Sequence, residues 1–71
     1  MHYVIYQDYI DSEGMPATGD YAYSDNILSA LKYMAEAVKE AIDKPQDNVH
    51  CVALCHNVVN RDRLIHAHAI K

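Results

Sequence analysis

Residues 24–43, SDNILSALKYMAEAVKEAID, decide the fold, because they form the only long run of this chain with a clean helical period. Counted from Ile27, apolar residues recur at the three- and four-residue intervals that place one stripe along a helix. These residues are Leu31, Met34, Ala35, Val38 and Ile42. Ser24 or Asp25 is expected to cap the first turn, and Pro45 stops the helix from continuing. The stretch therefore predicts an amphipathic helix with one face toward a core.

The segment before this helix predicts one or two strands. Residues 2–10, HYVIYQDYI, are rich in Tyr, Val and Ile, the residues that favour strands. Residues 11–20, DSEGMPATGD, are typical of a turn or loop. Tyr21 to Tyr23 is a candidate short strand that pairs back on the first, which makes residues 13–18 a hairpin loop.

The segment after the helix predicts a hairpin. Residues 44–48 form a connector, residues 49–59 a strand, residues 60–62 a turn and residues 63–70 a second strand. A hairpin centred on Arg61 places His56 opposite His66, and Leu54 opposite His68. The odd positions of both strands are small, which would let a helix approach closely. We therefore expect the helix to pack on Cys51, Ala53, Cys55, Ala67 and Ala69.

These elements predict one α+β domain over residues 1–71, in the order β-(β)-α-β-β, with a small antiparallel-rich sheet and one helix on one face. A single helix cannot cover both faces of a sheet. The other face would be too apolar to be left to solvent, which indicates a binding surface. One hypothesis is a homodimer that buries this histidine-bearing face. Its expected interface residues are Val52, Leu54, His56, Leu64, His66 and His68.

Length and cysteine content narrow the class of protein. A chain of 71 residues without Trp or Phe has a thin core, which favours an oligomer or a covering partner. Cys51 and Cys55, four residues apart on one strand, lie too far from each other to form a disulfide. No apolar run reaches the roughly 20 residues of a membrane helix, and no signal peptide is visible. We expect a cytoplasmic protein with no membrane partner.

The excess negative charge is concentrated in the N-terminal part of the chain. The formal net charge is −4, and residues 1–31 hold five acidic residues and no Lys or Arg. An acidic surface repels phosphates, so direct binding of nucleic acid is disfavoured. Carboxylates beside Tyr rings suit a partner rich in Arg or Lys, although the same residues would also be found in an ordinary solvated loop. The predicted partner-binding residues are Asp8, Tyr9, Asp11, Glu13, Asp20, Tyr21, Tyr23 and Asp25.

The histidines are the only group of side chains that suggests reactivity. His50, His56, His66 and His68 are expected on one sheet face, where two or three imidazoles could hold a transition metal. No H-E-x-x-H or C-x-x-C motif accompanies them. No glycine-rich phosphate loop and no nucleophile–base pair is recognisable, so no enzymatic activity and no cofactor are predicted.

As an architecture, the whole chain resembles the small phage- or plasmid-encoded inhibitor proteins that include anti-CRISPR proteins. The elements that carry the resemblance are the strand HYVIYQDYI, the helix SDNILSALKYMAEAVKEAI, and the hairpin of VHCVALCHNVV with RLIHAHAI. The resemblance implies a non-catalytic protein that occupies a nucleic-acid-binding or subunit-binding surface of a host complex, in the host cytoplasm if phage-encoded.

Three hypotheses therefore stand. The first is an inhibitor or adaptor whose acidic, Tyr-rich surface engages a basic protein surface. The second is a homo-oligomeric structural or assembly protein, and the third is a histidine metal binder. The first two are compatible, because one face can dimerise while another engages a partner.

Overall fold

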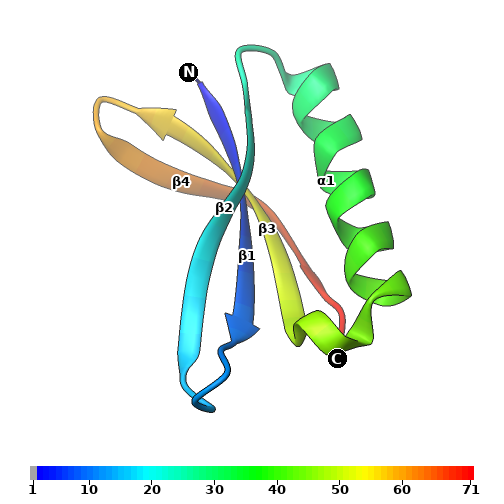
Figure 1. The fold of residues 1–71 in the computed structure, drawn as a ribbon. Helices are drawn as coiled ribbons and strands as arrows, with labels where there is room; N and C mark the ends of the chain where they lie inside the picture. Colours follow the sequence, from blue (N-terminus) through cyan, green and yellow to red (C-terminus); the bar gives the residue numbers. More distant parts are fainter. Residues whose placement is uncertain (1) are drawn as a thin grey trace.

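The structure, a computed structural model, describes residues 2–71 as one helix standing against a twisted four-stranded sheet (Figure 1). The strands are β1 (Tyr3–Ile10), β2 (Pro16–Ser24), β3 (Val49–Val58) and β4 (Arg61–Ala69). Helix α1 spans Ile27–Asp43, and the short 3₁₀ helix η1 spans Pro45–Asp47. The strand order is β2-β1-β3-β4, and every neighbouring pair is antiparallel. The predicted α+β class and element order are confirmed.

The first hairpin is longer than the predicted one. Strand β2 does pair back on β1, but it begins at Pro16 rather than at Tyr21. The connecting loop is held by Asp11, whose carboxylate accepts hydrogen bonds from the backbone N–H groups of Glu13 and Met15, both at 2.9 Å. Gly14 takes the left-handed conformation, with a φ of 81°. Because this turn is compact, β2 can begin at Pro16.

The helix begins later than predicted. Asn26 is the N-cap, and its side-chain oxygen accepts a hydrogen bond from the N–H of Ser29 at 2.8 Å. Ser24 closes β2 and hydrogen-bonds Asn26, so it does not cap the helix itself. The predicted cap at Ser24 or Asp25 is therefore wrong by one or two residues. The predicted end at Asp43 is confirmed.

The helix packs on the sheet face opposite to the predicted one. It lies over β1, β2 and β3, and Val52 and Leu54 are fully buried beneath it together with Ile5. Close approach is possible because the helix presents small side chains, Ala30, Ala37 and Ala41, together with Met34. The expected contact of the helix with Cys51, Ala53, Cys55, Ala67 and Ala69 is wrong. Those residues belong to the open face of the sheet.

The second hairpin turns earlier than predicted, which shifts its register. Val59 and Asn60, with φ angles of 50° and 61°, form a two-residue turn. A bulge at the step from Leu54 to Cys55 shifts the pairing further, so His66 lies opposite Leu54 and His68 opposite Val52. The predicted pairing of His56 with His66 is wrong, because His56 lies opposite Arg63.

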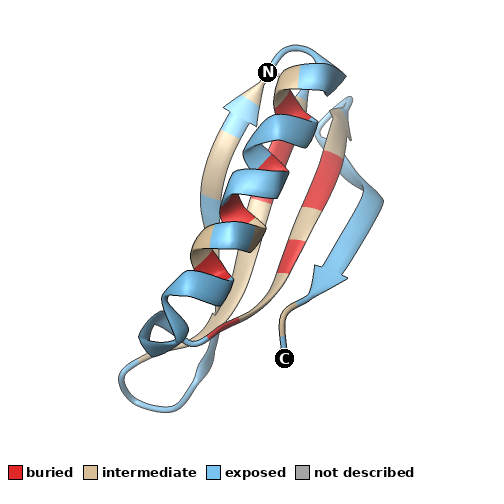
Figure 2. Ribbon diagram, turned by 90° about the vertical axis from the view of Figure 1, so that its right-hand side faces the viewer, coloured by how far each residue is buried: buried red, intermediate tan, exposed pale blue. Residues whose placement is uncertain are grey.

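Strand β4 is the uncovered edge of the molecule. Every one of its residues is exposed, whereas β3 beside it is largely buried (Figure 2). Helix α1 packs mainly on the other three strands. The fold thus leaves two surfaces for function. One is the open face of the sheet, and the other is the space between α1 and β4.

Candidate functional site

The open face of the sheet carries a cluster of carboxylates and phenols. Its members are Tyr6, Asp8, Asp20, Tyr23 and Asp62, which we call the acidic tyrosine face. The register explains why they meet. Tyr6 pairs with Asp20 on β2, and Val4, two residues earlier on the same face of β1, pairs with Tyr23. Asp62 lies on this face as well, because it pairs with Asn57 on β3.

Each carboxylate of the acidic tyrosine face accepts a hydrogen bond from a hydroxyl. Tyr6 donates to Asp62 at 2.5 Å, Tyr23 donates to Asp20, and Thr18 donates to Asp8 at 2.8 Å. Asp62 also accepts from the side-chain amide of Asn57 at 2.9 Å. The rings and carboxylates are therefore held in defined positions on a rigid sheet, which lowers the entropy cost of binding a partner.

The hydrogen bonds of the two tyrosines shift pKa values on this face. The bond from Tyr6, and then the bond from Asn57, lower the pKa of Asp62. The same bond to Asp62 is the largest cause that raises the pKa of Tyr6, and the bond to Asp20 raises the pKa of Tyr23. At neutral pH the face thus combines an ionised Asp62 with neutral phenols.

The surroundings of the acidic tyrosine face are small and apolar. Between its rings and carboxylates lie buried Val4 and Cys55, with Ala53 half-buried beside them. Desolvation raises the pKa of the Cys55 thiol, and the charges of Asp62 and Asp8 raise it further, so this cysteine is not activated. Strand alternation turns Arg61 and Arg63 to the helix side. Over residues 2–71, the register assigns no Lys or Arg to the open face.

The predicted partner-binding residues divide between three places. Asp8, Asp20 and Tyr23 belong to the acidic tyrosine face. Tyr9 and Tyr21 lie on the helix side, where both pack against the core and Tyr21 donates to Glu40 at 3.1 Å. Asp11 and Glu13 belong to the loop after β1, and Asp25 belongs to the link between β2 and α1.

Sequence reasoning missed Tyr6 and Asp62. Tyr6 has the same parity on the first strand as Asp8, and that shared parity was an available signal. Asp62 lies in a part of the sequence with nearly balanced charge, and only the strand order β1-β3-β4 brings it near Tyr6.

The predicted oligomer interface does not form one surface. Val52 and Leu54 are core residues beneath the helix, so their assignment to an uncovered face is wrong. Leu64 lies on the open face opposite Cys55, and the His56 ring stacks on Tyr3 with 4.7 Å between centroids. Only His66 and His68 remain together on an uncovered surface. Among residues 2–71, no three His, Cys, Asp or Glu side chains are placed to share a metal ion.

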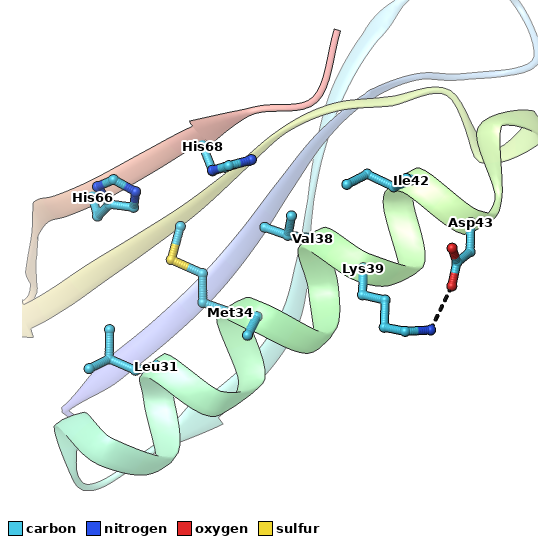
Figure 3. A pocket seen from close by; sticks show the side chains of 9 residues that line it. Leu31, Met34, Val38, Lys39, Ile42, Asp43, His66 and His68 are labelled. Carbon is cyan, nitrogen blue, oxygen red and sulfur yellow. Dashed lines mark hydrogen bonds and ion pairs between the residues drawn. The ribbon is translucent and has the colours of Figure 1, made fainter.

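His66 and His68 line a groove of about 480 Å³ between α1 and β4 (Figure 3). The facing wall is the apolar side of the helix, formed by Leu31, Met34, Val38 and Ile42. At the outer rim, Lys39 forms an ion pair with Asp43 at 2.8 Å. The groove is thus apolar along the helix and carries imidazoles along the strand.

A search of family models, of curated proteins and of solved structures finds no match to this chain. Across residues 2–71, no helix combines the length and the apolar character needed to cross a membrane. Functional inference therefore rests on the two surfaces themselves.

Proposed function

We propose that this chain is a non-catalytic protein-binding module that occupies a basic surface of a partner complex, as an inhibitor or adaptor. The observation that carries the proposal is the acidic tyrosine face. It places three carboxylates and two phenols on one open sheet surface, with Arg61 and Arg63 turned to the other side. Such a surface attracts Arg and Lys side chains and repels nucleic acid.

The pairing of rings with carboxylates favours a protein partner over an unspecific counter-ion. Tyr23 remains 46% exposed although its hydroxyl is engaged by Asp20. An exposed ring supplies rigid contact area and can stack on a guanidinium. Because each carboxylate oxygen can accept more than one hydrogen bond, Asp8, Asp20 and Asp62 can pair with an incoming Arg without losing their internal bonds.

The basic surfaces that match this face best are those that bind nucleic acid, because they carry Arg and Lys spaced for phosphates. The acidic tyrosine face offers negative charge on an open sheet surface, in place of a phosphate backbone. An inhibitor of the anti-CRISPR type would act in this way, by holding the surface that a nucleic acid needs.

The test is binding of a fluorescent arginine-rich peptide, measured by anisotropy at low and at high salt. The variant D8N/D20N/D62N removes the charge of the acidic tyrosine face. The matched control E13Q/E36Q/D47N removes the same charge from exposed positions outside it. We expect the first variant to bind roughly tenfold more weakly and the control to bind like the wild type, with binding weakened by salt. Equal loss in both variants would contradict the proposal.

A further inference from the structure

The groove between α1 and β4 is wide enough to hold one more helix. Helix α1 lies over β1 and its two neighbours, and β4 is two strands away from β1. Two strand spacings amount to about 10 Å, which is also the distance between the axes of two packed helices. A helix placed over β4 would therefore lie directly beside α1 and would cover the edge strand.

The side of α1 that faces this space is apolar but uncovered. Its buried stripe consists of Ala30, Met34, Ala37 and Ala41. Its larger aliphatic residues Leu31 and Ile42 line the groove and are 48% and 60% exposed. Leu28, three residues before Leu31, is 77% exposed.

The uncovered side repeats like a coiled-coil seam. Leu28, Leu31, Ala35, Val38 and Ile42 follow one another at intervals of three, four, three and four residues. This is the spacing of a and d positions over two heptads, which is the pattern by which two helices pack side by side. Lys32 and Lys39 flank the seam on its outer side, at the position where coiled coils carry charged residues.

We infer that this chain forms a two-fold symmetric dimer, in which the α1 helix of each copy fills the place beside α1 of the other. A second copy is the occupant that carries the matching seam. In this dimer the two α1 helices run parallel, and the two-fold axis lies between them along the seam. The two sheets then lie on opposite sides of the helix pair, so each α1 covers the β4 strand of the other copy.

A further observation agrees with a covered surface. The chain exposes 4840 Å², against about 4,500 Å² for a folded monomer of 8.1 kDa. One contact thus covers the seam and the edge strand in both copies.

The test is the mass in solution across a concentration series, by sedimentation equilibrium at neutral pH. We expect the wild type to dimerise and L31D/I42D to bind itself at least about 100-fold more weakly. Both residues are exposed in the single copy, so the variant should keep its far-UV circular dichroism spectrum. The control L64D replaces a somewhat more exposed leucine, 64% exposed on the open face, and should dimerise like the wild type.

The orientation of the helices has its own test. Oxidation of L28C should give a disulfide-linked dimer in high yield, because identical seam positions meet across the axis, whereas the wild type under the same conditions should not. A wild-type monomer at high concentration would overturn the inference. A dimer that survives L31D/I42D but is lost in L64D would also overturn it, as would a dimer in which L28C fails to cross-link.

Discussion

The hydroxyl of Tyr6 on β1 donates a hydrogen bond of 2.5 Å to Asp62 on β4, and so reaches across the intervening strand β3. This contact connects β1 and β4, strands from opposite ends of the chain, in addition to the backbone pairing of each with β3. It also lowers the pKa of Asp62 and raises that of Tyr6, which links the acidic tyrosine face to the stability of the fold.

Removal of this hydroxyl should change how stability depends on pH. The raised pKa of Tyr6 stabilises the fold below its usual value of 10, and that contribution is lost as pH rises through the higher value in the folded state. The lowered pKa of Asp62 stabilises the fold above its usual value of 3.8, and that contribution is lost as pH falls. Y6F should therefore be less stable than the wild type near neutral pH. Urea midpoints should converge at both extremes, and a constant difference across pH would contradict this explanation.

Leu54 should be a core residue, and Leu64 should not. Leu54 is fully buried beneath α1, so L54A should lower the free energy of unfolding by about 2–5 kcal/mol. L64A removes the same atoms from a side chain that is 64% exposed and should cost less than about 1 kcal/mol. Chemical denaturation of both variants gives the comparison. Equal costs would mean that the helix lies on the other face.

The turn of the second hairpin carries local strain at Val59. Its φ of 50° is a conformation that β-branched residues rarely adopt, and its side chain, 88% exposed, makes little compensating contact. V59N should raise the free energy of unfolding by about 0.5–1 kcal/mol, because Asn tolerates this conformation. The control V59I keeps the branch and should match the wild type. A neutral V59N would show that the turn is not strained.

The sequence was sufficient to predict the helix and the strands, but not which face of the sheet the helix covers. The period of residues 24–43 and the β-branched runs on either side depend on local chemistry, so α1, β1 and β3 were predictable. The choice of sheet face was not, because both faces of β3 are apolar and the decisive feature is the alanine stripe of the helix. Parity failed at the β3–β4 bulge, which places Leu64 on the open face although His66 and His68 lie on the helix side.

Some residues of the candidate site could be predicted from the sequence, and others could not. Asp8, Asp20 and Tyr23 stand out by charge and ring content in the first part of the chain. Tyr6 and Asp62 join them only through tertiary pairing between residues 56 positions apart. The groove was visible in part, since Leu31, Val38 and Ile42 were assigned to the core-facing stripe, whereas Val38 packs against the core and Leu31 and Ile42 are exposed.

The most direct test of the central proposal is competition. An arginine-rich peptide is first bound to a fluorescent single-stranded oligonucleotide, and the protein is then added while release of the oligonucleotide is followed by anisotropy. The proposal predicts that the wild type and E13Q/E36Q/D47N release the oligonucleotide and that D8N/D20N/D62N does so far less effectively. A ternary complex that retains the oligonucleotide, or equal release by all three proteins, would contradict the view that the acidic tyrosine face occupies nucleic-acid-binding surfaces.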